Sequence, residues 1–231
     1  HATEDKKNYK SIAAILVHTA PPGGKKSISM VDAMQLGYGQ GFYTDGETDL
    51  SLLMGLPYAA LNGINEDGFA IGVLALKENQ TQQNTGKPRI GTTTAIRMLL
   101  DRASTVKEAV AMLKNYDMNM KGAGNSNYHY FMADATGDYA IVEYTLKRGE
   151  KIPTVMEKLT GNDTLRCVTN FYVSPTMVGT NDGWGSNHGK ERYWKIRNKL
   201  AENNYELSSD DAMSLLSDVS QPADLTNITS Q

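Results

Sequence analysis

Residues 58–76 constrain the fold most strongly, because they contain two apolar segments separated by the turn residues Asn-Glu-Asp-Gly. Asn, Asp and Gly adopt the backbone conformations of a tight turn at little cost, so this pattern predicts a β-hairpin. Both arms are apolar at nearly every position. We therefore expect other parts of the chain to cover the hairpin on both faces.

Further strand signals lie on either side of this hairpin. Residues 11–21 are apolar and β-branched and end at a Pro-Pro-Gly-Gly turn, which predicts a buried strand with residues 27–36 as its hairpin partner. Residues 128–144 contain a second hairpin pattern that turns at Thr-Gly-Asp. Shorter strands are expected at residues 152–158 and 164–173.

Two pairs of helices are predicted by apolar residues at helical spacing. The first pair is expected at residues 92–103 and 105–117, and its second helix opens with a Thr-x-x-Glu capping box. The second pair is expected at residues 189–203 and 208–219. The order of strands, helix pair, strands and helix pair predicts a single α+β domain over residues 1–231. Its two antiparallel sheets would be sandwiched between the helix pairs.

Composition limits the possible functions. The formal net charge of −3 gives no electrostatic reason to expect a nucleic acid partner. No apolar run approaches the roughly 20 residues that span a bilayer, so we expect no membrane span. The histidines show no metal-binding spacing, so no zinc site is expected. A single cysteine excludes an intrachain disulfide and is compatible with the cytoplasm or with a secreted bacterial protein, which leaves the location open.

Cys167 is the only cysteine, so its environment decides whether it can be a nucleophile. A strand over residues 164–173 would place Cys167 on one face together with Leu165 and Phe171. A thiol among apolar side chains is typical of a buried structural cysteine. A reactive thiolate would instead require a nearby base or an electropositive, partly exposed setting. We therefore interpret Cys167 as structural, and a cysteine hydrolase that uses it is the weaker alternative.

Two polar residues are better candidates for function. Asn170 would face away from Cys167, and an inward-facing strand asparagine needs hydrogen-bond partners or a role in chemistry. Arg192 lies in the first turn of a predicted helix, where the helix dipole favours acids over bases. Binding a carboxylate or an oxyanion would explain this cation, and a solvated arginine is the alternative.

Residues 37–49, GYGQGFYTDGETD, form a loop that is rich in glycine and tyrosine. Such a loop can line the rim of a pocket, and a plain surface loop is about equally compatible with the pattern. If the loop shapes a pocket, then Tyr38, Phe42 and Tyr43 are candidates for contact with a substrate.

Several motifs occur in an order that is shared with one protein family. GINEDGFAIGVLAL and NYHYFMADATGDYAIVEY look like two of its hairpins, LLDRASTVKEAVAMLKNYDM like its helix pair, CVTNFY like its Leu-Thr-Asn strand, and KERYWKIRNKL like its arginine-aromatic helix. Over most of residues 12–230 the chain resembles the choloylglycine hydrolase and penicillin acyltransferase group of N-terminal-nucleophile (Ntn) hydrolases. The resemblance implies an αββα sandwich, in agreement with the layered α+β prediction.

The resemblance also implies a mechanism. An N-terminal cysteine would attack the carbonyl of a linear amide with its own α-amine as the base, and water or a second amine would release the acyl group. No metal or organic cofactor is implied. Asn170 matches the family asparagine that donates to the oxyanion, and Arg192 matches the arginine that orients the surroundings of the nucleophile. Phe171, next to Asn170, is a further candidate for substrate contact.

The chain departs from the family pattern in two ways. It starts at His1, without the family cysteine, so we expect an upstream or companion segment to carry the nucleophile with an Arg and an Asp. We also expect a last strand beyond the C-terminus. Ala75 occupies a position where bile-salt hydrolases and penicillin V acylases have an asparagine, so only its backbone N–H remains as a donor to substrate. This favours a general acyl-amide hydrolase or an acyltransferase over a bile-salt hydrolase.

The sequence thus leaves three kinds of function open. The first is hydrolysis of a small-molecule amide: an N-acyl amine, an N-acyl amino acid, or a bile-salt or penicillin-type amide. The second is acyl transfer by the same site. The third is a non-catalytic binding protein that has lost the nucleophile. The oligomeric state is also open, and a homo-oligomer is compatible with the sequence.

Overall fold

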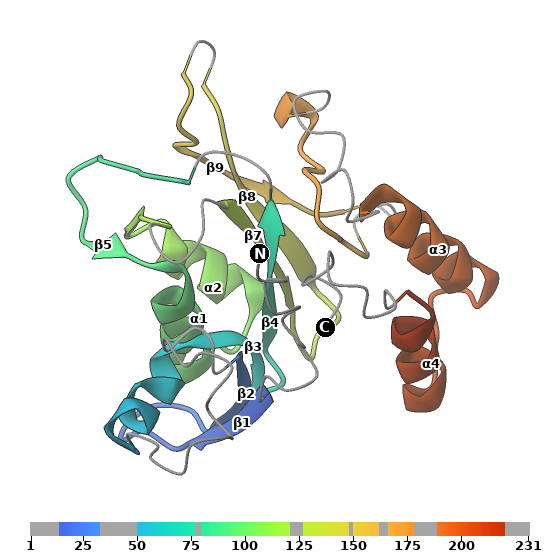
Figure 1. Cartoon of the computed structure of the whole chain (residues 1–231), viewed down its shortest axis with the longest axis horizontal. Helices are drawn as coiled ribbons and strands as arrows, with labels where there is room; N and C mark the ends of the chain where they lie inside the picture. Colours follow the sequence, from blue (N-terminus) through green and yellow to red (C-terminus); the bar gives the residue numbers. More distant parts are fainter. Residues whose placement is uncertain are drawn as a thin grey trace, which may run out of the picture.

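The computed structural model describes residues 14–32, 50–76, 80–120, 127–147, 150–161, 166–177 and 189–219. Its main element is a seven-stranded sheet in which every pair of neighbours is antiparallel. Figure 1 shows this sheet between two pairs of helices. In spatial order its strands are β1 (Ala14–Thr19), β2 (Ser27–Asp32), β3 (Ala60–Asn65), β4 (Ala70–Leu76), β7 (Asn127–Ala133), β8 (Tyr139–Thr145) and β9 (Val155–Leu159).

The hairpin predicted over residues 58–76 is confirmed by β3 and β4, and its turn is built around Asn65. The side-chain oxygen of Asn65 accepts hydrogen bonds from the backbone N–H groups of Asp67 and Phe69. Its amide nitrogen donates to the backbone carbonyls of Leu100 and Ala103. One buried side chain therefore fixes the turn and joins it to the end of the first helix.

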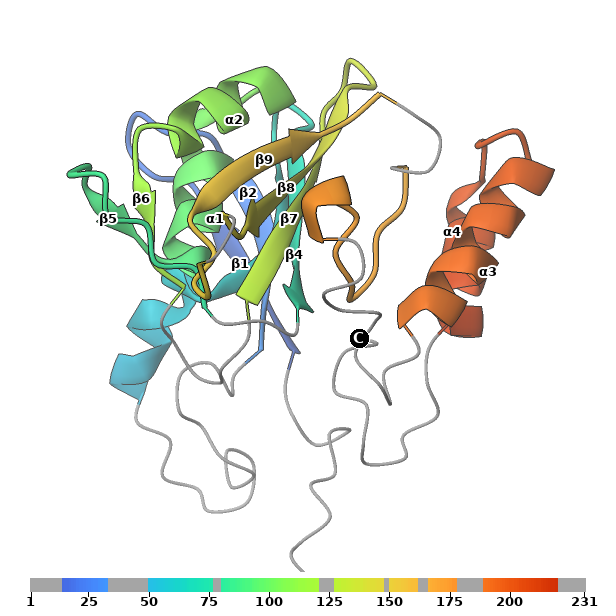
Figure 2. The ribbon, with the colours of Figure 1, turned by 90° about the horizontal axis from the view of Figure 1, so that it is seen from above.

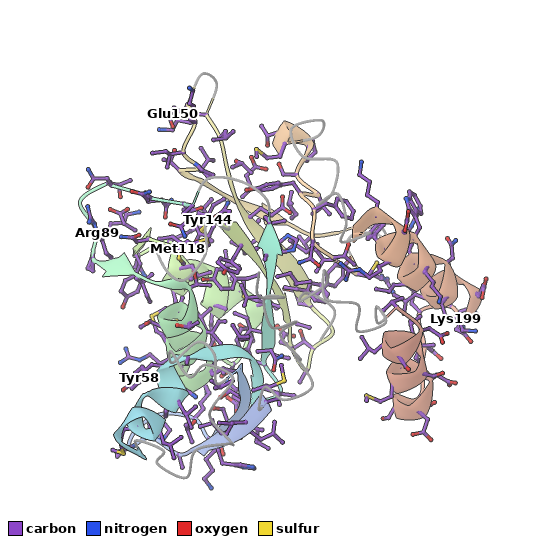
Figure 3. The ribbon with its side chains drawn as sticks, viewed as in Figure 1. Tyr58, Arg89, Met118, Tyr144, Glu150 and Lys199 are labelled. Atoms are coloured by element: carbon purple, nitrogen blue, oxygen red, sulfur yellow. The ribbon has the colours of Figure 1, made fainter. Side chains whose placement is uncertain are left out.

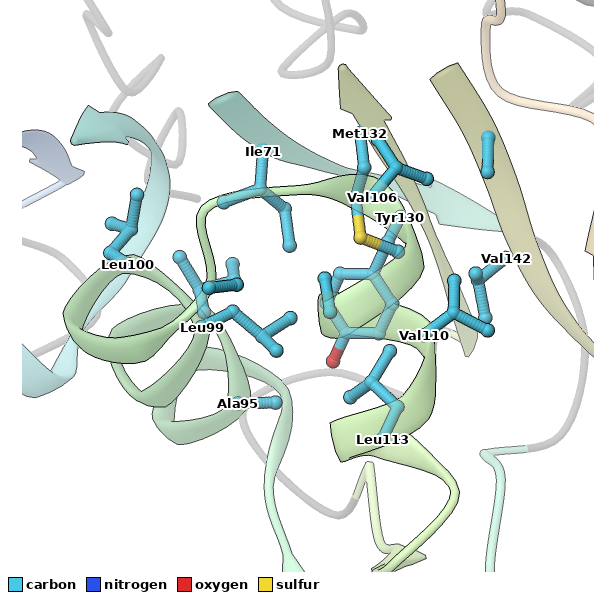
Figure 4. Close-up of a cluster of buried hydrophobic side chains, with 14 of the residues drawn as sticks. Ile71, Ala95, Leu99, Leu100, Val106, Val110, Leu113, Tyr130, Met132 and Val142 are labelled. Atoms are coloured by element: carbon cyan, nitrogen blue, oxygen red, sulfur yellow. The ribbon is translucent and has the colours of Figure 1, made fainter. Parts of the chain in front are cut away.

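Helices α1 (Thr92–Arg102) and α2 (Val106–Leu113) cover one face of the sheet. Figure 2 shows both helices on the same side of the strands. Their apolar stripes pack against β4, β7 and β8, and Figure 4 shows part of this core. Tyr144 and Met118 also belong to it, whereas Arg89, Glu150 and Lys199 lie at the periphery (Figure 3). The first predicted helix pair is confirmed.

The opposite side of the sheet is covered unevenly. Residues 166–177, which end in the 3-10 turn η5 (Pro175–Met177), lie on this side, followed by α3 (Gly189–Glu202) and α4 (Ser209–Val219) (Figure 2). Near β1 to β3, however, Leu16, Ile28 and Ile64 are 67%, 41% and 49% exposed. The expectation that hairpin 58–76 is covered on both faces is thus wrong at Ile64.

The α+β class is confirmed by this mixture of helices and a mainly antiparallel sheet. Apart from the large sheet, the described residues contain a two-stranded parallel sheet of β5 (Arg89–Ile90) and β6 (Asp117–Met118), and the 3-10 helix η3 (Leu50–Tyr58). The second antiparallel layer of the αββα sandwich stays a prediction, as does the single-domain assignment. None of the helices in the described ranges is long and apolar enough to cross a membrane.

One predicted strand is wrong. Residues 166–173 follow an irregular path and pair with no strand of either sheet. The physical reason is that their hydrogen bonds are made with side chains and with the start of α3. Thr169 Oγ1 donates to the carbonyl of Gly189, and the backbone N–H of Val173 donates to the carboxylate of Glu143.

Candidate functional site

Asn170 is a buried residue whose side chain has a defined partner at each end. Its Nδ2 donates to the carbonyl oxygen of Ala75 on β4 at 2.9 Å, and its Oδ1 accepts from Nη2 of Arg192 on α3 at 2.8 Å. The side chain is thereby held between the sheet and the helix, with 3% of its surface exposed. An asparagine amide carries two N–H donors, so the second N–H remains to donate to a bound group.

The start of α3 packs directly against this asparagine. Gly189 is the first residue of α3, and a Cβ atom placed on it would lie 3.3 Å from the carbonyl oxygen of Asn170. Only a residue without a side chain therefore permits this approach without displacement. The hydroxyl of Thr169 donates to the Gly189 carbonyl at 2.6 Å, which fastens the two segments together.

Arg192 is in the first turn of α3, as predicted, and its side chain is buried. Burial lowers the pKa of its guanidinium, yet a guanidinium stays protonated at any physiological pH. The positive charge and the N-terminus of the helix both favour negative charge nearby. A carbonyl oxygen that gains negative charge during attack would be stabilised in this setting.

Aromatic packing completes the connection between the segment and the helix. The ring of Phe171 contacts the ring of Tyr193 edge-on, with 5.2 Å between centroids. Phe171 is half-buried, next to Asn170 in the chain. The site therefore combines an oriented amide, a buried cation and an aromatic surface, contributed by β4, α3 and the segment of residues 166–177.

Cys167 lies in the same segment but has the properties of a structural thiol. It is 6% exposed, and burial raises its pKa to about 11, although Arg197 has a smaller opposing effect. The thiol is therefore protonated at neutral pH and is a poor nucleophile. Its burial agrees with the sequence interpretation, but the reason does not, because no strand aligns it with its neighbours.

Other predicted site residues stand as follows. The backbone carbonyl oxygen of Ala75 accepts the hydrogen bond from Asn170, and contact of the Ala75 N–H with a substrate stays a prediction. Tyr38, Phe42 and Tyr43 lie outside the described residues. Within the part of the chain that the structure describes, no cluster of His, Cys, Asp and Glu could hold a metal ion.

Sequence reasoning missed two buried polar residues that contact the segment carrying Asn170 or each other. Glu143 and His129 are both fully buried on adjacent strands, whereas an acid near the end of a predicted strand is typically exposed or ion-paired. The sequence signal that could have identified this pair is the position of the two residues in the hairpin. The two residues stand at opposing positions of the predicted hairpin 128–144, where their side chains share one face.

Comparisons with known proteins identify a family and a shared fold. Residues 53–230 match the family model described as acyl-coenzyme A:6-aminopenicillanic acid acyl-transferase. Conjugated bile acid hydrolase from Clostridium perfringens has a similar structure, with a TM-score of 0.53 and 16% identity over 86% of this chain and 64% of that one. Penicillin V acylase from Agrobacterium tumefaciens is also similar, with a TM-score of 0.53 and 18% identity over 87% of this chain and 58% of that one.

The chain thus spans less than two thirds of the length of either solved structure. At such low identity, the likeness shows a shared fold. No curated protein matches the chain.

Proposed function

Because the chain belongs to the acyl-coenzyme A:6-aminopenicillanic acid acyl-transferase family, we propose that it acts in the cleavage of linear amides. The observation that carries this proposal is the arrangement of Asn170, which is held by Ala75 and Arg192 with one amide N–H left to donate. A donor fixed before the reaction begins stabilises charge without any cost of reorganisation at that moment.

In the proposed reaction, a cysteine sulfur attacks the amide carbonyl carbon and the carbonyl oxygen becomes negatively charged. The second N–H of Asn170 donates to this oxygen, and Arg192 keeps Asn170 oriented. The amine then leaves with a proton, and a thioester remains on the enzyme. Water releases the acyl group as an acid, or a second amine takes it and forms a new amide.

The nucleophile in this proposal is an N-terminal cysteine outside these 231 residues, with its α-amine as the base. Cys167 does not suit the role, because its thiol is buried, its pKa is raised and it has no free α-amine. Tyr38, Phe42, Tyr43 and Phe171 remain our candidates for the surface that contacts the acyl group.

The test is amide turnover by the full-length protein, measured as amine release from penicillin V and from a conjugated bile acid. We expect Asn170→Ala to lower kcat by roughly 10²–10³-fold, the usual effect of losing one oxyanion donor. Asn115→Ala is the control, since Asn115 is exposed and bonds only within its own helix end. An unchanged kcat in Asn170→Ala would contradict the assignment.

Acyl transfer is the second candidate, and the family match favours it because the matched model is that of an acyltransferase. Adding 6-aminopenicillanic acid as an acceptor to the conjugated bile acid reaction, where it differs from the amine released, separates the two. A transferase forms a new penicillin at the expense of free acid, whereas a hydrolase gives the same amount of acid with or without the acceptor.

A further inference from the structure

Glu143 is a buried carboxylate that anchors the segment carrying Asn170. It lies on β8 with none of its surface exposed. One of its oxygens accepts from the backbone N–H of Val173 and the other from that of Ser174, both at 2.9 Å. Nδ1 of His129, which is also fully buried on β7, lies 3.0 Å from the first oxygen.

These contacts are not needed to form the sheet. The backbone of Glu143 is already paired with β9, opposite Glu157, and an apolar side chain would fill a sheet position at lower cost. Burying a carboxylate is unfavourable unless several donors surround it. Here the donors are two backbone N–H groups of the irregular segment 166–177. The carboxylate therefore accepts hydrogen bonds that a neighbouring strand would otherwise accept.

The groups around Glu143 support the same segment. Glu157 on β9 accepts from the hydroxyls of Ser174 and Thr176, and Nδ2 of Asn127 on β7 donates to the hydroxyl of Tyr172. Besides Glu143, the titratable groups whose hydrogen bonds lie in this region are Glu157, His129 and Tyr172. Nε2 of His129 is buried and has no hydrogen-bond partner among the residues that the structure describes, where the side-chain contact of His129 is the one with Glu143.

We propose that Glu143, oriented by His129, is a positioning residue for Asn170. Val173 is three residues beyond Asn170, so the anchor fixes the backbone on one side while the Thr169 hydroxyl fixes it on the other. Ala75 and Arg192 then set the direction of the amide. The proposal rests on the proposed function in one respect, that Asn170 is the oxyanion donor.

The first test reports on Asn170 without any substrate. The side-chain amide signals of Asn170 are recorded by NMR and identified by their loss in Asn170→Ala. Glu143→Gln keeps the shape of the side chain but turns one acceptor into a donor that faces a backbone N–H. We expect the Asn170 amide signals to shift or broaden in Glu143→Gln, because the backbone of the segment that carries Asn170 is no longer fixed.

The matched control is Asp117→Asn. Asp117 is also a buried carboxylate, and it accepts from the backbone N–H groups of Thr85 and Lys87, away from the segment of residues 166–177. The Asp117→Asn variant should be less stable than wild type, while the NMR signals of the Asn170 side-chain amide stay in place. Unmoved signals in folded Glu143→Gln, or equal movement in Asp117→Asn, would overturn the proposal. If Glu143→Gln does not fold, the same criteria apply to His129→Gln.

The second test is kinetic. Misplacing a catalytic group by about 1 Å can cost up to about 100-fold in rate. We therefore expect kcat to fall in Glu143→Gln by tens of fold with KM little changed, and kcat to stay near wild type in Asp117→Asn. Absence of amide turnover in the wild type would count against the proposed function, whereas the NMR comparison would still decide whether Glu143 positions Asn170.

Discussion

Asn170 combines two contacts that strengthen each other. When Arg192 donates to the side-chain oxygen, it draws electron density from the amide group, and the N–H donors of the same amide become stronger. The Ala75 carbonyl occupies one of these donors and sets the direction of the other. A neutral side chain is thus converted into an oriented donor beside a positive charge.

Cys167 provides a prediction about alkaline pH. Its pKa is raised by burial from the ordinary 9.0 to about 11, so the folded state favours the protonated thiol. The corresponding stabilisation is fully present below about pH 9 and is lost as the pH rises through about 11. We expect wild type to lose about 2 kcal/mol more stability than Cys167→Ala across this range, measured by urea unfolding. Parallel curves for the two proteins would contradict the burial of the thiol.

At the residue scale, the sequence suggested candidates but not their contacts. Asn170 and Arg192 could be named from a polar residue next to an apolar strand pattern and from a cation at a helix start. The contact between Asn170 and Arg192 could not be predicted, because it depends on where α3 begins relative to the segment before it. Gly189 permits the close approach of α3 to the backbone of Asn170. Glu143 could not be named from the sequence, because an acid near a strand end is most often solvated.

At the scale of elements, local signals sufficed wherever the partner was near in sequence. The hairpins turn at Asn65–Gly68 and at Thr136–Gly137, where both glycines have positive φ angles of 80° and 84° that favour glycine. The segment of residues 166–173 failed as a predicted strand for the opposite reason. Its partners are Glu143 and Gly189, and no local pattern reports a side chain that replaces a strand.

The start of α2 gives a prediction at this scale. Asp134, in the β7–β8 turn, accepts from the backbone N–H of Val106 at 2.8 Å and from that of Thr136 at 2.9 Å. Burial raises the pKa of Asp134, but the hydrogen bond from the Thr136 hydroxyl, together with those from the backbone N–H groups, outweighs it and leaves the pKa below the ordinary 3.8. Removing the carboxylate leaves an N-terminal donor of the helix unsatisfied and removes a charge that the dipole favours.

We expect Asp134→Ala to destabilise the protein by about 1–2 kcal/mol, which lowers Tm by about 3–6 °C. The difference from wild type should shrink as the pH falls below 3.8, because the protonated acid loses the same advantage. Asp138→Ala is the control, since the Asp138 side chain is exposed and accepts from the N–H of the adjacent Tyr139. Equal losses in both variants would show that the cap contributes nothing specific.

At the scale of the whole molecule, the sheet has one complete face and one incomplete face. The face under α1 and α2 has a continuous core, whereas Leu16, Ile28 and Ile64 are exposed on the other. Apolar sheet faces are normally covered by a second layer. The second sheet of the αββα sandwich would supply such a layer through contacts far apart in sequence, and it stays a prediction.

The same scale carries the prediction on the nucleophile. The candidate site offers an oriented amide donor and a buried cation, but the single cysteine among the 231 residues is buried and protonated. The proposed chemistry requires a thiol whose own α-amine is the base, and only a polypeptide that begins with cysteine has one. We therefore expect such a polypeptide in the active protein, either as a longer chain or as a companion.

Intact mass spectrometry with N-terminal sequencing of every polypeptide in the active preparation checks this. Finding a chain that begins with cysteine, whose alkylation removes amide turnover while Cys167 stays unlabelled, would support the mechanism. Turnover by a preparation containing only a chain that begins at His1 would contradict it, because no residue of the described site could then supply the attacking sulfur. A preparation without turnover and without such a polypeptide would instead favour the non-catalytic binding relative.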